Sequence, residues 1–173
     1  MTANLQPILN GKILALRPLA PTDLEELYKV ASDPLIWDMH PFPRHERTAF
    51  ADFFDQAVKS KSGLVIVDGE TQKIIGASRY YGLGEDQVFI GYTFLARSHW
   101  GGKFNRELKT MMLKHAFKFA RQVFFDIGEE NKRSRRAIEK IGASFVKLQT
   151  LNEKPYTLYR IDEKSFCNHV SDF

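Results

Sequence analysis

Ser98-His-Trp-Gly-Gly-Lys-Phe-Asn105 links an apolar β-like run, Val88 to Leu95, to a long amphipathic pattern, Arg106 to Arg121. A strand that enters a glycine turn at the start of a helix presents unpaired backbone N–H groups and the positive end of the helix dipole to an anion. The turn matches neither the Walker A loop nor the GxGxxG fingerprint, so the common nucleotide motifs do not explain it. We therefore predict an anion-binding turn here.

A second strand–helix unit follows the first. Val123 to Ile127 predicts a short strand, and Asn131 and Ser134 stand at the start of a short helix that ends at Gly142. Basic residues at this start oppose the helix dipole, which is more reasonable beside a bound phosphate than on a merely solvated face. Two such units side by side suit a ligand with a pyrophosphate and a long amide-bearing arm. Coenzyme A has this chemistry.

The rest of the chain alternates between strand and helix patterns without a repeat or a composition break, which predicts one domain over residues 1–173. The predicted order is β-α-α-β-β-β-α-β-α-β-β. The elements outside the two central units are strands at 13–18, 64–67, 73–80, 144–150 and 156–161, a helix opening at 22–23, and a helix at 47–59. Gly91 inside its strand indicates a bulge or a close backbone approach. We expect the tail, 162–173, to be loosely ordered.

Composition and charge limit the possible functions. Hydrophobic residues make up 43% of the chain and charged residues 27%, as in ordinary globular proteins. The net charge of +4 suits a polyanionic small ligand but falls short of a dedicated nucleic-acid binder. Cys167 is the single cysteine, so no disulfide can form within the chain. We expect a cytoplasmic protein with no membrane attachment and no metal site, since no signal, long apolar run or metal-ligand spacing is seen.

These residues resemble the GNAT acetyltransferase superfamily, most closely its branch of ribosomal-protein-alanine N-acetyltransferases. The similarity extends from Leu16 to the last β run. It is sharpest at Ile90-Gly-Tyr92, Trp100-Gly101 with Glu107, His115-Ala-Phe117, and Asn131-x-x-Ser134 with Glu139-Lys-Ile-Gly142. The resemblance implies an α+β fold, with a twisted and mostly antiparallel mixed sheet of about seven strands. That sheet splays open beside its fourth strand and carries about four helices.

The resemblance also implies where acetyl-CoA, the co-substrate, binds. The pantetheine arm lies along the backbone of Phe94, Leu95 and Ala96. The pyrophosphate lies on N–H groups of the turn and helix start, at Gly101, Gly102, Lys103, Phe104, Asn105 and Arg106, and Trp100 is a further cofactor-binding residue. Asn131 hydrogen-bonds the arm, and Ser134 lies near the sulfur. The family's signature is altered here, because Ser98 replaces a leading cation and Lys103 replaces a small residue.

For catalysis, the residue that protonates the leaving thiolate differs from the usual one, because no Tyr lies between Asn131 and Gly142, where many family members have one. Ser134 is predicted to hydrogen-bond the departing sulfur, the alternative being a cap of its helix. Glu153, in the turn between the last two β runs, is preferred as general base over Glu107, Asp126 and water. The acceptor entrance is predicted to be lined by Trp37, His40 and Phe42, unless ordinary loop packing explains these three.

The leading hypothesis is an N-acetyltransferase that moves the acetyl group of acetyl-CoA directly to a primary amine: a protein N-terminus, an amino acid, a polyamine or an antibiotic. A CoA-binding regulatory or sensor domain with little or no turnover is the alternative, favoured by the altered signature and the missing Tyr. Nucleic-acid binding has least support, since stacking aromatics are not interleaved with the cations. We expect a monomer or homodimer with a small-molecule or peptide acceptor.

Overall fold

The computed structural model describes residues 3–170. Its strands are β1 (Leu9–Asn10), β2 (Leu14–Pro18), β3 (Gly63–Asp68), β4 (Ile74–Tyr81), β5 (Gln87–Leu95), β6 (Gln122–Gly128), β7 (Ser144–Leu151) and β8 (Lys154–Asp162). Its α-helices are α1 (Leu24–Ala31), α2 (Arg47–Lys59), α3 (Lys103–Ala116), α4 (Lys132–Glu139) and α5 (Glu163–Val170). Short 3₁₀ turns lie at Pro21–Asp23, Pro34–Ile36 and Arg97–His99.

The strands form a single sheet in the order β1-β2-β3-β4-β5-β6-β8-β7. Neighbouring strands are antiparallel except β5 and β6, which run parallel. The predicted α+β fold with a mixed, mostly antiparallel sheet is therefore confirmed. Within the described residues there is one strand and one α-helix more than predicted, and the additional elements are the two-residue β1 and the C-terminal α5.

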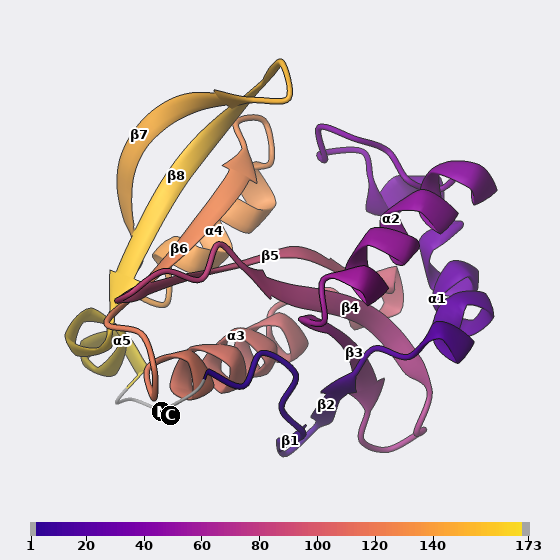
Figure 1. Ribbon diagram of the computed structural model, residues 1–173, viewed down its shortest axis with the longest axis horizontal. Coiled ribbons are helices and arrows are strands. Elements are labelled where there is room, and N and C mark those ends of the chain that lie inside the picture. The colour runs from indigo at the N-terminus through magenta and orange to yellow at the C-terminus, as the bar shows by residue number, and fades with distance from the viewer. Residues whose placement is uncertain (1–2, 171–173) are drawn as a thin grey trace.

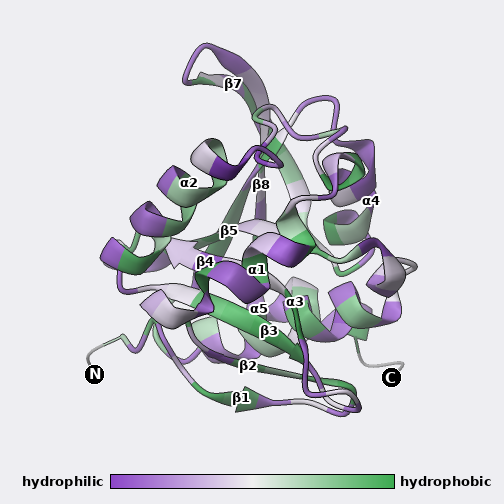
Figure 2. Cartoon of the chain, turned by 90° about the vertical axis from the view of Figure 1, so that its right-hand side faces the viewer, coloured by the Kyte–Doolittle hydropathy of each residue, from purple (hydrophilic) through white to green (hydrophobic). Residues whose placement is uncertain are grey.

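Two apolar cores lie on opposite faces of the sheet. Along β3, Leu64 and Ile66 belong to one core and Val65 to the other, as the alternation of a strand requires. The first core packs under α3, and the second packs under α1 and α2. Figure 1 shows α1 and α2 together on one side of the sheet and α3 on the other. Figure 2 shows β3 in green, as an apolar strand beneath α1.

The opening of the sheet lies between its two parallel strands. Gln87 to Phe89 of β5 pair with Gln122 to Phe124 of β6, and no pairing continues beyond them in the described chain. The register of β5 against β4 also shifts here, because Ala77 faces Phe94 while Arg79 faces Gly91. Two residues of β5 thus oppose one of β4, which is a β-bulge at Tyr92 and Thr93. The predicted splay and the irregularity beside Gly91 are both present.

Element boundaries near the turn differ slightly from the prediction. The helix predicted at 47–59 is confirmed as α2. The amphipathic pattern beginning at Arg106 starts as a helix already at Lys103, because the turn ends at Gly102, whose φ of 110° favours glycine. The helix ends at Ala116, and tight turns from there lead the chain into β6.

The expectation of a loosely ordered tail is wrong for 162–170. Asp162 ends β8 and pairs with Gln122 on β6. Its carboxylate accepts a hydrogen bond from the Ser165 N–H at 2.8 Å, which caps the start of α5. Phe166 is buried, and its ring lies 5.8 Å from that of Phe117. A cap and one buried aromatic side chain order this segment, while residues 171–173 lie outside the described chain.

Candidate active site

The turn before α3 leaves backbone amides exposed. Gly101 and Gly102 have φ of 104° and 110°, in the left-handed region that favours glycine. A Cβ added to either residue would meet no atom within 4 Å, so this backbone faces open space. The Arg106 N–H donates to the Gly102 carbonyl at 2.9 Å. The amides of the turn before Arg106 precede the helical ladder, which is the arrangement that binds anions.

Side chains from three elements fix this turn on the sheet. The indole Nε1 of Trp100 donates to the Leu95 carbonyl at 3.0 Å. The guanidinium of Arg133, from α4, lies 3.8 Å from the centroid of the Trp100 ring. His99 Nε2 lies 2.8 Å from an Asp68 carboxylate oxygen at the end of β3. The turn is therefore held in place before any ligand arrives.

The edge of β5 at the sheet opening supplies a second set of backbone groups. The N–H of Ala96 donates to the Ile75 carbonyl on β4 at 2.8 Å, so this amide is already used. Because backbone groups alternate in direction along an antiparallel pair, Phe94 also points to β4 and Leu95 points into the opening. Among the three predicted backbone positions, Leu95 is the one whose N–H faces the space between β5 and β6.

The start of α4 lies on the other side of this opening. Asn131 is 3% exposed, and its side-chain Oδ1 accepts the Ser134 N–H at 3.1 Å. Asn131 is thus the N-cap of α4. Ser134 lies on the first turn of that helix, with its own side chain not required for the cap.

One cavity of about 2350 Å³ joins the turn, the β5 edge and α4. Most predicted site residues line it: His40, Phe42, Phe94, Leu95, Trp100, Gly101, Gly102, Lys103, Asn105, Arg106, Asn131 and Ser134. The other predicted residues, all in the described chain, lie outside its lining: Trp37, Ala96, Phe104 and Glu153.

Two aromatic residues outside the lining support it from behind. Trp37 is 3% exposed and belongs to the core under α1 and α2. Its indole Nε1 donates to the Ala31 carbonyl at 2.8 Å, and its ring lies 5.2 Å from that of His40. Phe104 packs edge-on against His99 with 4.6 Å between ring centroids. Packing therefore accounts for both side chains.

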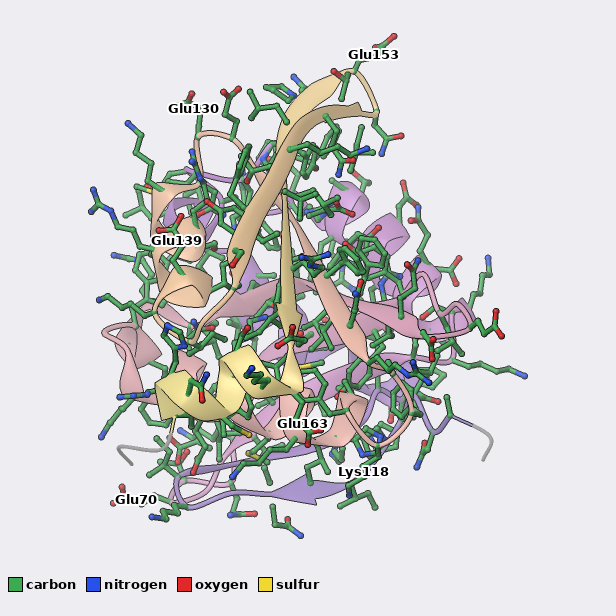
Figure 3. The ribbon with its side chains drawn as sticks, turned by 90° about the vertical axis from the view of Figure 1, so that its left-hand side faces the viewer. Glu70, Lys118, Glu130, Glu139, Glu153 and Glu163 are labelled. Atoms are coloured by element: carbon green, nitrogen blue, oxygen red, sulfur yellow. The ribbon has the colours of Figure 1, made fainter. Side chains whose placement is uncertain are left out.

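Glu153 lies at the tip of the β7–β8 hairpin, as Figure 3 shows. It is exposed and occupies the two-residue turn with Asn152, where both residues have positive φ. Leu151 and Asn152, directly before it, line the cavity, whereas the exposed Glu153 does not. The geometry favours another of the carboxylates that the sequence offered as general base.

That carboxylate is Asp126 on β6, which lines the cavity at the opening. Its Oδ2 accepts from the Tyr81 hydroxyl at 3.0 Å, and its Oδ1 accepts from Gln149 Nε2. Desolvation raises the pKa of Asp126 above its ordinary value, although these two hydrogen bonds oppose the shift. Tyr81 reaches across β5 because Gly91 has no side chain: a Cβ there would lie 2.9 Å from Tyr81 Cε1. The close contact at Gly91 is thus with a side chain and not with backbone, and it is the bulge that bears the prediction out.

The segment 38–46 closes the end of the cavity next to Asp126. Pro41 packs on Gly128 at the end of β6, where an added Cβ would lie 2.5 Å from Pro41 Cγ. Burial lowers the pKa of His40 to about 4, so its imidazole is neutral at pH 7. We call this end the aromatic chamber and define it by the cavity-lining residues His40, Phe42, Arg44, Tyr81, Tyr92, Asp126 and Tyr156.

Lys109 on α3 lines the same cavity and is only 7% exposed. Its Nζ donates to Thr93 Oγ1 at 2.8 Å and lies 5.8 Å from the centroid of the Phe125 ring. Burial lowers the pKa of Lys109 to about 7. A lysine whose charged form is this poorly solvated is unusual in a merely structural position.

A scan against family models matches residues 14–144 to the acetyltransferase (GNAT) domain. The match spans well over half of the chain. The chain belongs to the GNAT acetyltransferase family. Members of this family are in general acetyl-CoA-dependent N-acetyltransferases. The branch of ribosomal-protein-alanine N-acetyltransferases stays a prediction.

Solved GNAT structures share this fold at low sequence identity. A GCN5-related N-acetyltransferase from Brucella melitensis superposes with a TM-score of 0.81 at 18% identity, covering 93% of this chain and 80% of that one. A putative acetyltransferase from T. thermophilus gives 0.79 at 20% identity, with 95% and 94% covered. Spermidine N-acetyltransferase from Vibrio cholerae, in complex with CoA and spermine, gives 0.71 at 16% identity, with 91% and 100% covered. A search of curated proteins finds no match.

None of the helices within 3–170 has the length and apolar character needed to cross a bilayer. No three or more His, Cys, Asp or Glu side chains in the same range are grouped so as to hold a metal ion.

Several cavity residues were not found by sequence reasoning. Lys109 could have been, because it shares the buried stripe of α3 with Met112, Leu113 and Ala116. A lysine on such a stripe is a visible anomaly. Arg44 offered no such signal, since its position depends on the path of an irregular segment.

Proposed function

We propose that this GNAT protein transfers the acetyl group of acetyl-CoA directly to a primary amine. One observation carries the proposal: a continuous cavity joins an open glycine turn, suited to a pyrophosphate, to a chamber that holds a desolvated carboxylate. A protein N-terminus, an amino acid, a polyamine and an antibiotic are all primary amines, and the comparisons leave this choice open.

The residues around the turn fit the phosphates of acetyl-CoA. Gly101 and Gly102 border open space, and Lys103 and Arg106 add basic side chains along the cavity. An extended amide-bearing arm fits the unpaired edge of β5 at Leu95, where it would add to the strand. Asn131 presents a buried amide on the facing wall.

The reaction exchanges one bond for another. A C–N bond forms between the amine and the acetyl carbonyl carbon, and the thioester C–S bond breaks. The acceptor enters as an ammonium and must first lose a proton to attack, and its nitrogen loses a second proton once the C–N bond has formed. The leaving thiolate gains one proton, so one proton is released in total. An N–H of the β5 edge near Leu95 stabilises the carbonyl oxygen as charge develops on it.

In this proposal Asp126 is the general base in place of Glu153. It lies in the cavity, and its raised pKa brings it closer to the range in which a base is effective. Ser134 remains the proposed hydrogen-bond donor to the departing sulfur. Tyr156 also lines the chamber near Asp126, and desolvation raises the pKa of its hydroxyl above the ordinary value.

Lys109 has a proposed role on the wall of the acyl-CoA site. Its ammonium has three donors, of which the hydrogen bond to Thr93 uses one. The amide carbonyls of an acyl-CoA arm would accept hydrogen bonds from the remaining two donors. We expect Lys109 to be protonated more readily when that arm is bound.

A paired assay tests the proposal against the sensor alternative. Acetyl-CoA binding is measured by titration calorimetry, and turnover is measured as free thiol released over a panel of primary amines. Binding with acetylated product from at least one amine, verified by mass spectrometry, supports the enzyme. Binding without product from any amine favours the sensor domain.

Cytoplasmic location and a monomeric or homodimeric state stay predictions. Strand β7, at the sheet edge, exposes Phe145, Val146 and Leu148.

A further inference from the structure

We infer that the acceptor is a primary amine that also carries a carboxylate, as a free amino acid does, and that Arg44 binds this carboxylate. The inference rests on the proposed function and narrows its acceptor class. It comes from two arginines at the aromatic chamber, Arg44 and Arg79, that form no ion pair with an acidic side chain within residues 3–170.

Arg44 is the cation that faces the chamber. It lines the cavity, and its guanidinium lies 4.4 Å from the centroid of the Phe53 ring and 5.9 Å from that of Phe42. Its one hydrogen bond within the described part of the chain is a long contact of 3.4 Å from Nη1 to the Phe42 carbonyl. The ion pairs of residues 3–170 include none with Arg44. Most of its five donors are therefore available to a ligand.

Arg79 supplies a second cation from behind the chamber wall. It lies on β4, is 8% exposed, and its buried Nε has no hydrogen-bond partner. Its guanidinium lies 3.6 Å from the centroid of the Tyr92 ring, which lines the chamber. Arg79 likewise takes part in no ion pair within 3–170, and its charge contributes to lowering the pKa of Arg44, after desolvation.

The acids nearby are already engaged. Asp126 accepts hydrogen bonds from Tyr81 and Gln149 at its two oxygens. Asp38 lies 4.0 Å from Arg133. Two like charges that are partly desolvated and lack a counter-ion are costly, and aromatic faces offset only part of that cost. A carboxylate on the ligand would complete this site, because a guanidinium matches its geometry with two parallel hydrogen bonds.

The same charges disfavour a polyamine. A polyamine would bring additional ammonium groups toward Arg44, and the chamber offers Asp126 alone among its lining residues to receive them. Repulsion between the ammonium groups of a polyamine and Arg44 would lower the affinity for polyamines, and such repulsion sets specificity as favourable contacts do. The likeness to a spermidine acetyltransferase, at 16% identity, is one of fold and does not alter this argument.

Matched amines test the inference. Each pair differs only by the carboxylate: phenylalanine with phenethylamine, and lysine with cadaverine. We expect the carboxylate member to be preferred about tenfold or more in kcat/KM, and to bind CoA-saturated protein about tenfold more tightly by calorimetry, as one desolvated charge pair provides. Equal values within each pair, or a preference for the decarboxylated member, would overturn the inference. So would a preference for phosphoethanolamine over every carboxylate-bearing amine.

Variants locate the effect at Arg44. In Arg44→Met, which keeps much of the packing and removes the charge, the preference should fall toward unity, and Arg44→Lys should retain part of it. The matched control is Arg47→Met, because Arg47 is exposed and pairs with Glu25 outside the cavity. A preference that persists in a folded Arg44→Met protein would refute the assignment. Absence of turnover with every amine would count against the proposed function, while the calorimetric comparison would still decide the carboxylate.

Discussion

The two ends of the cavity are built in different ways. The glycine turn at one end is made of backbone from a single continuous segment, with Gly101 and Gly102 in conformations that only glycine adopts readily. The aromatic chamber at the other end is made of side chains from the 38–46 segment, β4, β5, β6 and β8. A backbone site can tolerate changed side chains, so we expect Ser98 and Lys103, at altered family positions, to leave cofactor binding in place. The chamber has no such tolerance, since its chemistry resides in the side chains themselves.

This difference suggests a division of labour. In the proposed function, the backbone end binds the part of acetyl-CoA that is common to the family, and the side-chain end selects the acceptor. Variants at the two ends should therefore fail differently: those at the turn in cofactor affinity, and those at the chamber in turnover and acceptor choice.

The largest effect is expected at Asp126. Asp126→Asn should lower kcat by roughly 1,000-fold, as loss of a general base does, while leaving acetyl-CoA affinity within about twofold. The acid limb of the kcat/KM profile, which should lie above the ordinary Asp pKa because desolvation raises it, should disappear. Glu153→Gln is the matched control, removing a carboxylate from the hairpin tip. Steady-state kinetics in which Glu153→Gln is the impaired variant would reverse the assignment.

The next effect separates charge from strain at the turn. Gly101→Glu and Gly101→Lys impose the same backbone strain at a φ of 104°, but they place opposite charges against the phosphates. Gly101→Glu should weaken acetyl-CoA binding roughly 100-fold, and Gly101→Lys by less than about tenfold. Calorimetric titration of both proteins gives the comparison. Equal losses in the two variants would mean that the phosphates lie elsewhere.

Lys109 lines the cavity on α3, and its burial should make the free energy of unfolding depend on pH. Its pKa is about 7 in the folded protein against 10.5 ordinarily, so the unfolded chain holds the proton more strongly between these values. Stability should therefore rise from pH 7 toward 10.5. Lys109→Met should abolish that rise and stabilise the protein at pH 7 by on the order of 4 kcal/mol. Urea unfolding at pH 7 and pH 9 measures both, with exposed Lys118→Met as control. An unchanged pH slope in Lys109→Met would show that the amine is not desolvated.

The smallest effect distinguishes two roles of Asn131. Asn131→Ala loses the cap of α4, costing about 1 kcal/mol of stability, and about fivefold in acetyl-CoA affinity if one hydrogen bond to the arm is lost. Asn131→Asp keeps the oxygen that accepts the Ser134 N–H but removes the amide donors. Thermal unfolding and binding should then separate, with stability kept and affinity reduced. Full affinity in Asn131→Asp would limit Asn131 to the cap.

The sequence predicted the backbone end well and the chamber poorly, for the same physical reason. Glycines, strand alternation and helix starts are local signals, and they located the turn, the bulge beside Gly91 and the opening of the sheet. Whether a side chain faces a cavity depends on packing between distant elements. Trp37 lies in the core, where its indole Nε1 donates to the Ala31 carbonyl. Glu153 lies exposed in a two-residue turn with Asn152. Arg44 and Tyr81 reach the chamber through contacts that no short segment encodes.

A crystal structure with bound CoA would locate the cofactor. We expect the pyrophosphate within hydrogen-bond distance of backbone amides in 101–106, and the pantetheine arm beside Leu95 in the opening between β5 and β6. CoA bound at another surface, with this opening filled only by solvent, would refute this placement.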